Sequence, residues 1–270
     1  DDLFPSLTAK YAIKPNLLFD IGWGKAILRP DLAKLSNVSQ TNDTNDEVTT
    51  PNTNLQPERS QKIAAALSYF FGNAGINNVQ FVASRTRVTN KFTQARLTSD
   101  EFGNTDPDFA DYTFVSWSNI PMPTVYNSLE YSYQQYLSFL PRVLQGTSVT
   151  LSYTNTFLDN QTNPKVLGVI PHTVKGTINY RLKKFSMSFS TIWQSDSNEY
   201  QAGNRYQLAN TKCDLTANYQ ITDRLQVFLA GRNIFEESHR LMEKSPGNPD
   251  VLYRYENYGT NWTFGIRGTF

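Results

Sequence analysis

The sequence predicts an all-β fold, in which about eleven antiparallel strands form the wall of a transmembrane β-barrel. Apolar and polar residues alternate with a period of two in segment after segment, which is typical of strands with one apolar and one wet face. Short and long connections between these segments alternate along the 270 residues. The composition combines 13% aromatic with only 18% charged residues, below the roughly 25% of an average soluble domain.

The strands follow from the alternation. It is plainest at 185–193, where Phe185, Met187 and Phe189 alternate with Ser186 and Ser188. No segment has a convincing helical period, and no run approaches the roughly 18 apolar residues of a transmembrane helix. In chain order, the pattern predicts strands at 6–13, 16–27, 62–71, 76–88, 125–140, 147–157, 173–182, 185–193, 213–221, 225–235 and 261–270.

The connections distinguish a membrane barrel from a soluble sandwich. Short links lie near residue 15 and at 72–75, 140–146, 183–184 and 222–224, and long ones at 28–57, 90–124, 158–170, 197–206 and 237–256. An up-and-down barrel in an outer membrane has short periplasmic turns and long extracellular loops. The 28–57 loop contains a polar run that we expect to bury no core.

The alternation of short and long connections also predicts an orientation of the barrel in the membrane. The last strand follows a long loop, so it runs inward, and the C-terminus is expected in the periplasm. A soluble β-sandwich with one face on its core remains the alternative interpretation of the strand pattern.

Several stretches resemble the C-terminal barrel region of TonB-dependent outer-membrane receptors. The likeness lies in FDIGWGKAILRPDLAKL at 19–35, NTNLQPERSQKIAAALSYFF at 52–71, LEYSYQQYLSFLP at 129–141 with GRNIFEE at 231–237, and YENYGTNWTFGIRGTF at 255–270. These stretches occur in the family's order and span nearly the whole chain.

The resemblance implies a place in a larger barrel. The family's barrel has 22 strands and a plugged lumen, and bacterial single-chain barrels have even strand numbers. We therefore expect residues 1–270 to be the C-terminal part of the barrel, with the plug domain and the N-terminal strands outside this chain.

The resemblance also implies a function: TonB-energised uptake of a scarce solute such as a metal chelate, a vitamin or a glycan. The expected location is the outer membrane of a Gram-negative cell. The expected partners are outer-membrane lipid and lipopolysaccharide, TonB through the plug region, the outer-membrane assembly machinery and an unknown solute. Nearly balanced charges, 25 basic against 24 acidic residues, argue against a nucleic-acid partner.

Aromatic residues in the 90–124 loop are candidates for ligand binding. Phe92, Phe102, Tyr112 and Trp117 lie among Asp and Asn residues, a mixture that suits stacking against an aromatic chelate or a sugar ring. The same residues could instead form a small apolar cluster that keeps a long loop folded, and this interpretation is favoured.

The final strand carries an expected membrane-assembly signal. Its residues are Gly259, Trp262, Phe264, Ile266 and Phe270, in which apolar side chains share one face of the strand. In the family, the assembly machinery reads this strand.

Two arginines stand on the apolar parity of the strand at 76–88. Arg85 and Arg87 could snorkel towards lipopolysaccharide phosphates or begin the following loop, and a solvated position is favoured.

Nothing in the sequence predicts an enzyme, a metal site or a cofactor. The two histidines, His172 and His239, lack further ligands at metal-binding spacing. Ser238 and His239 could belong to a triad assembled in space, but a solvated loop is favoured. Two other functions remain open: a soluble secreted lectin-like module and, with less support, an outer-membrane barrel enzyme.

Overall fold

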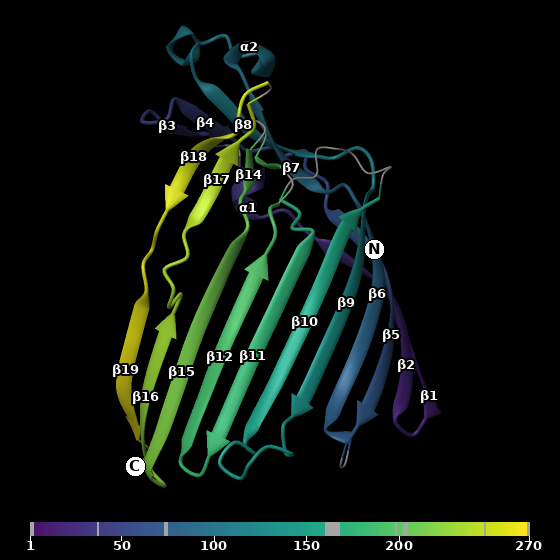
Figure 1. The fold of residues 1–270 in the computed structure, drawn as a ribbon. Coiled ribbons are helices and arrows are strands. Elements are labelled where there is room, and N and C mark those ends of the chain that lie inside the picture. Colours follow the sequence, from purple (N-terminus) through teal and green to yellow (C-terminus); the bar gives the residue numbers. More distant parts are fainter. Residues whose placement is uncertain are drawn as a thin grey trace.

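The main sheet is a continuous antiparallel meander. The computed structural model describes residues 3–36, 38–72, 75–159, 168–197, 199–201, 205–245 and 247–268. Eleven strands, in this spatial order, form the sheet (Figure 1): β1 (Ser6–Lys14), β2 (Leu17–Leu28), β5 (Glu58–Phe71), β6 (Asn77–Thr89), β9 (Thr124–Tyr136), β10 (Thr147–Leu158), β11 (His172–Leu182), β12 (Phe185–Gln194), β15 (Asn210–Thr222), β16 (Leu225–Arg232) and β19 (Asn261–Gly268). The predicted set of strands is confirmed.

Some strand ends differ from the sequence pattern. β5 begins at Glu58, four residues earlier than expected, because its polar residues 58–61 all pair with β2 and residues 59–61 pair with β6 as well. β9 ends at Tyr136, and the chain then enters a turn. β16 ends at Arg232, because Asn233 adopts a positive φ of 50° that a strand does not accommodate.

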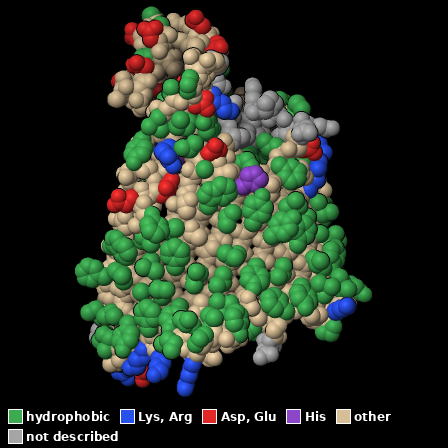
Figure 2. Space-filling view, in the orientation of Figure 1, with side chains coloured by type: hydrophobic (Ala, Val, Ile, Leu, Met, Phe, Trp, Pro, Cys, Tyr) green, Lys and Arg blue, Asp and Glu red, His purple; other side chains and the backbone are tan. Residues whose placement is uncertain are grey.

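The register aligns residues of the same character in rows across the sheet. In one row, Phe19 pairs with Leu67, Leu67 with Phe81, Phe81 with Tyr131, and Tyr131 with Tyr153. Because side chains alternate between the two sides of a strand, all of these residues share one face. We call it the apolar face, and Figure 2 shows its broad band of hydrophobic side chains.

The opposite face, here the polar face, carries small polar and charged side chains. Ser186, Ser188 and Ser190 of β12 lie on it, and so do Lys10 and Asp20, whose Nζ and Oδ1 are 3.8 Å apart. This composition suits a wet lumen.

The sheet is a single layer. Among the described residues, neither face is covered by a second sheet, and side chains of the apolar face are strongly exposed: Phe264 by 84% and Ile266 by 70%. A soluble sandwich would bury such a face against another sheet. The structure therefore argues against the sandwich alternative.

The connections alternate as expected. The short turns lie at one end of the sheet, and the long connections described by the structure gather at the other (Figure 1). The last strand runs towards the short-turn end. Parts of the 72–75, 158–170 and 197–206 connections lie outside the described residues.

The 28–57 and 90–124 loops are folded, which corrects the expectation that the 28–57 run buries no core. They contain helices α1 (Leu32–Leu35) and α2 (Ser99–Phe102) and the 3-10 turn η2 (Pro107–Phe109). Their strands β3 (Gln40–Asn42), β4 (Glu47–Thr50), β7 (Phe92–Leu97) and β8 (Thr113–Asn119) form the first loop sheet, in the order β3-β4-β8-β7.

A second loop sheet stands beside the first at the same end (Figure 1). It consists of β13 (Glu199–Gln201), β14 (Arg205–Gln207), β17 (His239–Glu243) and β18 (Val251–Glu256), paired in that order. Among the described residues, no helix is long and apolar enough to cross a membrane, a finding that concerns helices alone.

The main sheet has two open edges, β1 and β19, so it does not close on itself. An edge strand leaves a row of backbone N–H and C=O groups unpaired, and such groups cost several kcal/mol each in lipid. The expectation that β19 pairs with a further strand in a complete barrel therefore stays a prediction.

Candidate ligand-capture surface on the loop sheets

The first loop sheet is held by an apolar core outside the main sheet. Val115 and Ile120 are 0% and 1% exposed, and Val48 and Phe114 are 5% exposed. Val48 pairs with Phe114 where β4 and β8 run parallel, so two loops far apart in sequence share this core. The favoured interpretation of the sequence expected a small apolar cluster within the 90–124 loop, but not that Val48 of the 28–57 loop contributes to it.

Two asparagines tie the same loops together through backbone groups. Asn119 accepts a hydrogen bond from the amide of Gln56 at 2.8 Å and donates from Nδ2 to the carbonyls of Gln56 and Asn90 at 2.8 and 2.6 Å. Asn52 donates from Nδ2 to the Trp117 carbonyl at 2.9 Å. The loops are thus fixed to each other just above β5 and β6.

Phe92 and Trp117, two of the candidate binding residues, lie against a lysine of the neighbouring loop. Lys34 of α1 places Nζ 4.5 Å from the centre of the Trp117 ring and 5.6 Å from that of Phe92, and Asp31 pairs with the same Nζ at 2.9 Å. Cation–π contacts of this kind are favourable when the cation is partly desolvated. These two rings are therefore engaged within the loop sheet.

Phe102 and Tyr112, the other two candidates, belong to the tip of the loop. Phe102 stacks on Phe114 with ring centres 4.4 Å apart, and Tyr112 meets Phe109 edge-on at 5.1 Å. The Tyr112 hydroxyl donates to Asp43 at 3.2 Å, and desolvation together with this carboxylate raises the pKa of Tyr112.

The structure does not bring the four candidates into one surface. Phe92 and Trp117 form one group beside α1, and Phe102 and Tyr112 lie in another at the tip. The tip also carries many acidic residues (Figure 2), including Asp100 and the capping-box residue Glu101 of α2. The aromatic residues chiefly hold the loop together, as the favoured interpretation of the sequence expected.

The second loop sheet carries a cation–aromatic cluster that sequence reasoning missed. The Arg205 guanidinium lies 3.4 Å from the centre of the Tyr253 ring, and its Nε donates to Glu243 at 3.0 Å. Tyr206 donates its hydroxyl to Asp250 at 2.8 Å, and this hydrogen bond is the main cause of its raised pKa. The clustered tyrosines of VLYRYENYG, at 251–259, were the signal in the sequence.

At the opposite end of the second loop sheet, Glu256 of β18 is in contact with several polar and charged side chains. Arg254 donates to it, which is the largest cause of its lowered pKa, and a hydrogen bond from Tyr258 acts in the same direction. His239 Nδ1 lies 3.4 Å from Glu256 Oε2, without forming a hydrogen bond to it. Glu256 is therefore held ionised by its neighbours.

In the part of the chain that the structure describes, no constellation for catalysis is assembled around the two histidines. Ser238 donates to the Tyr255 hydroxyl at 2.8 Å, and the Nδ1 contact of His239 is with Glu256. His172 Nδ1 lies 2.9 Å from the Tyr153 hydroxyl. Within the described ranges, no group of three His, Cys, Asp or Glu residues could hold a metal ion.

The final strand places three of its five expected assembly residues on the apolar face. Trp262, Phe264 and Ile266 share that face, and Gly259 precedes them with a positive φ of 65°. The Trp262 ring lies over Gly231 of β16, where an added Cβ would come within 2.5 Å of it. Phe270 lies outside the described residues.

These features define a class of protein. A single antiparallel sheet with an apolar and a polar face, short turns at one end and folded loops at the other, is the wall of an outer-membrane type of β-barrel. The chain belongs to the TonB dependent receptor-like β-barrel family, whose family model matches residues 1–234.

Solved structures of receptors share the fold. A mutant of the ferric enterobactin receptor PfeA from Pseudomonas aeruginosa superposes with a TM-score of 0.66 at 14% identity, over 99% of this chain and 40% of that one. The siderophore receptor PirA from the same organism gives 0.61 at 15% identity, over 99% and 42%.

FpvA of P. aeruginosa, bound to a pyoverdine, also superposes, with a TM-score of 0.61 at 16% identity, over 98% of this chain and 32% of that one. The chain therefore spans between 32% and 42% of the length of these three structures. No curated protein matches the chain.

Proposed function

We propose that this chain is the C-terminal wall section of an outer-membrane receptor that takes up a scarce solute with energy supplied through TonB. The observation that carries the proposal is that the chain matches the family model. The single-layer sheet, which has one exposed apolar face that could lie against lipid, supports it. The plug domain and the remaining barrel strands would be contributed by sequence outside residues 1–270.

In this role the chain supplies a rigid wall and part of the capture apparatus. The two loop sheets stand at the end opposite the short turns, so they face outward if that end is extracellular. The C-terminus is then periplasmic. TonB would act on the plug rather than on these strands, and the chain needs no catalytic group.

The leading candidate solute is a ferric siderophore. One structure with the same fold is a ferric enterobactin receptor, and another is FpvA bound to a pyoverdine. The catechol rings of a catecholate chelate are flat and aromatic, and the exposed tyrosines of the second loop sheet offer stacking surfaces for them. A vitamin or a glycan remains the second choice.

An uptake assay tests the proposal. The complete receptor, expressed in an iron-starved host without its own receptors, should accumulate radiolabelled ferric siderophores from a panel. Accumulation should disappear when tonB is deleted or the proton gradient is collapsed. Equal accumulation with and without TonB would contradict energised uptake, whereas uptake of a labelled vitamin or glycan alone would change only the solute.

The candidate aromatic groups take different parts in this proposal. We assign the Phe92 and Trp117 pair to holding the loops together, and the tip residues Phe102 and Tyr112 to the outer boundary of the capture surface. The final strand, including Gly259 and Phe270, would serve recognition by the outer-membrane assembly machinery.

A further inference from the structure

Charge is distributed unevenly between the two ends of the main sheet. The chain as a whole is nearly neutral, with a net charge of +1. Among the described residues, however, the short-turn end has seven basic side chains against one acidic side chain, Asp223, and Figure 2 shows Lys and Arg gathered along its lower edge. The basic residues, which lie in the turns or in the last two residues of a strand, are Lys14, Arg142, Arg181, Lys183, Lys184, Arg224 and Arg267.

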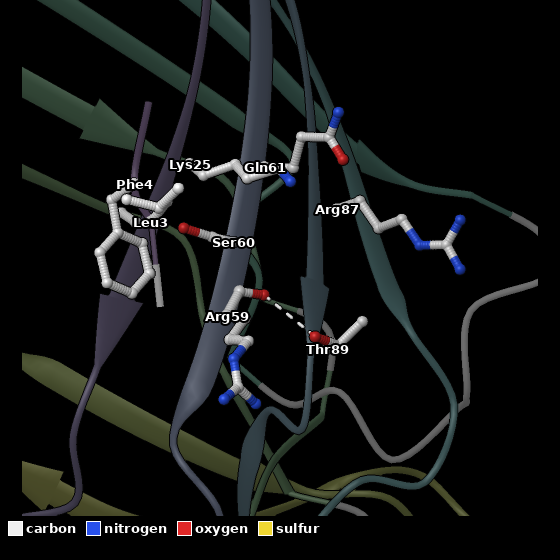
Figure 3. Close-up of a pocket in the computed structure, with 9 residues that line it drawn as sticks. Leu3, Phe4, Lys25, Arg59, Ser60, Gln61, Arg87 and Thr89 are labelled. Atoms are coloured by element: carbon white, nitrogen blue, oxygen red, sulfur yellow. Dashed lines mark hydrogen bonds between the residues drawn. The ribbon is translucent and has the colours of Figure 1, made fainter. Parts of the chain in front are cut away.

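The opposite end of the sheet, here the loop end, has basic side chains that are mixed with carboxylates. Lys25 and Arg87 of the apolar face line a cavity of about 360 Å³ at that end, with Leu3 and Phe4 on one side of it (Figure 3). The loops of the same end contain most of the acidic residues of the chain. Concentrated positive charge is therefore a property of the short-turn end.

Three neighbouring turns at the short-turn end form one continuous surface. Lys184 Nζ donates to the Ile221 carbonyl at 3.0 Å, which joins the turn between β11 and β12 to the end of β15. The Tyr180 hydroxyl of β11 donates to the Val143 carbonyl at 2.7 Å, which joins the turn between β9 and β10 to β11. We call these turns together the turn surface, which consists of residues 137–146, 183–184 and 223–224.

The turn between β9 and β10 holds apolar side chains outward on a fixed backbone. Phe139, Val143 and Leu144 are 71%, 61% and 46% exposed. Four backbone hydrogen bonds of 2.7–3.1 Å close the turn. Gly146 lies so close to β11 that an added Cβ would come within 1.7 Å of the Arg181 carbonyl oxygen. The apolar side chains are thus presented by a preorganised turn, which lowers the entropic cost of binding a partner.

The basic side chains of the turn surface are not neutralised by neighbouring carboxylates. Arg142, Lys183 and Arg224 are exposed. Within the described ranges, none of the three forms an ion pair with a carboxylate within 4 Å. Such a group of like charges attracts anions over about 10 Å at an ionic strength of 0.1 M.

The positive charge surrounds the rim of the wall and does not follow its apolar face alone. Arg181 and Arg267 have the parity of the polar face, because they pair with Ser186 and Gln226. Lipid headgroups lie against the apolar face of a barrel wall, so they would meet only a part of this charge. A polyanion in the aqueous compartment next to the turns would meet all of it.

We propose that the turn surface binds peptidoglycan, the anionic polymer of the cell wall. The peptide stems of this polymer carry free carboxylates, which would accept charge-assisted hydrogen bonds from Arg142, Lys183 and Arg224. Its sugar rings have apolar C–H faces that suit stacking on the exposed Phe139 ring. The inference rests on the orientation in the proposed function, which places this end in the periplasm, but it does not depend on which solute is taken up.

Co-sedimentation with isolated, protein-free sacculi tests the binding, with the complete receptor purified in detergent. The combined variant Arg142→Glu, Lys183→Glu and Arg224→Glu should lower the sedimented fraction at least fivefold, because the altered surface repels carboxylates. Lys184 is left in place because its ammonium group holds two turns together. Heat-dependent gel mobility verifies that the variant is folded.

A matched control makes the same change of net charge at the loop end. The combined variant Lys25→Glu, Arg29→Glu and Arg87→Glu, at three exposed positions, should sediment as the unaltered receptor does. An equal loss of binding by the two combined variants would show an effect of net charge alone and would overturn the proposal.

The chemistry of the ligand is tested on the sacculi themselves. Sacculi whose carboxylates have been converted to amides should retain at least fivefold less receptor. Phe139→Ala should weaken binding about twofold. Its control is Phe235→Ala, which removes a phenylalanine that is 70% exposed at the loop end. Mixed micelles that contain phosphatidylglycerol should not displace the receptor from unmodified sacculi.

Undiminished sedimentation of the turn-surface variant, or of the unaltered receptor with amidated sacculi, would overturn the proposal. Displacement by phosphatidylglycerol micelles would assign the surface to lipid headgroups and also overturn it. If the combined variant fails to fold, Lys183→Glu and Arg224→Glu alone should each lower sedimentation about twofold. Solute uptake is measured separately, so a negative result here leaves the proposed transport function standing.

Discussion

At the scale of single residues, glycines let aromatic rings lie flat against the sheet. Gly231 accommodates Trp262 on the apolar face, and Gly265 accommodates Phe228 on the polar face, where an added Cβ would come within 2.9 Å of the ring. Arg267 then lies over the same Phe228 ring at 5.5 Å. β16 and β19 are thus in close contact through glycine–aromatic pairs on both faces of the sheet.

The first prediction concerns these glycine–aromatic contacts. Gly231→Ala should displace the Trp262 ring and destabilise the folded barrel by about 1–3 kcal/mol, the usual cost of overpacking. Urea unfolding in lipid vesicles measures the change. Gly22→Ala is the control, because its nearest contacts would be 3.8 Å away. Equal stability of the two variants would show that Trp262 does not need the space.

A second residue-scale prediction concerns pH. The folded-state pKa of Glu256 is lowered, chiefly by the hydrogen bond from Arg254. Its contribution to the order of β18 is therefore complete above the ordinary pKa of 4.5 and is lost as the pH falls through the lowered value. Amide hydrogen exchange at 251–256 should accelerate on acidification through that window, and Glu256→Gln should remove the pH dependence.

At the scale of elements, the period-two pattern predicted the main strands because each has at least eight residues, the length of β16 and β19. The loop strands escaped prediction because β3 and β13 have only three residues each, too few to show a period. The parallel pairing of β4 with β8 joins segments about 65 residues apart, which no local pattern reveals. The Lys34 contact with Trp117 is hidden for the same reason.

The loop core gives an element-scale prediction. Val115→Asp places a charge at a fully buried position, so the first loop sheet should unfold while the main sheet stays intact. Solute affinity should fall at least tenfold, with normal heat-dependent gel mobility. Ser116→Asp, at the neighbouring half-buried position, is the control. Unchanged affinity of Val115→Asp would remove this loop sheet from the capture surface.

The final strand gives a second element-scale prediction, which concerns assembly into the membrane. Deleting Phe270, or Phe270→Ala, should lower the amount of receptor in the outer membrane severalfold, because the terminal aromatic belongs to the expected assembly signal. Loss of an interfacial side chain should cost the folded state only about 1–3 kcal/mol. Immunoblots of membrane fractions measure insertion. Normal insertion with failed solute binding would instead make Phe270 part of a site.

At the scale of the whole molecule, the prediction of a barrel wall succeeded because lipid and lumen impose opposite requirements on alternate residues of every strand. The solute could not be predicted, because recognition depends on which loop side chains meet in space. The charge pattern of the outer wall also has meaning only in the assembled sheet, since Lys25 and Arg87 are 62 positions apart in the chain.

The orientation is tested on whole cells. In a Cys213→Ser background, cysteines at Asn45 and Asn104, in the two loops of the first loop sheet, should react with an impermeant thiol reagent. Cysteines at Lys183 and Asp223, in the short turns, should react only after the outer membrane is opened. The reverse pattern would contradict a periplasmic C-terminus.

The shared core of the 28–57 and 90–124 loops has a consequence for how such a receptor can evolve. Because β4 and β8 pair directly and Asn119 holds Gln56, neither loop can change its length or path without disturbing the other. The two loops should therefore change together during evolution. A descendant that acquires a new solute preference by exchanging one of them with a relative must exchange both, and chimaeras that split the pair should lose their extracellular fold.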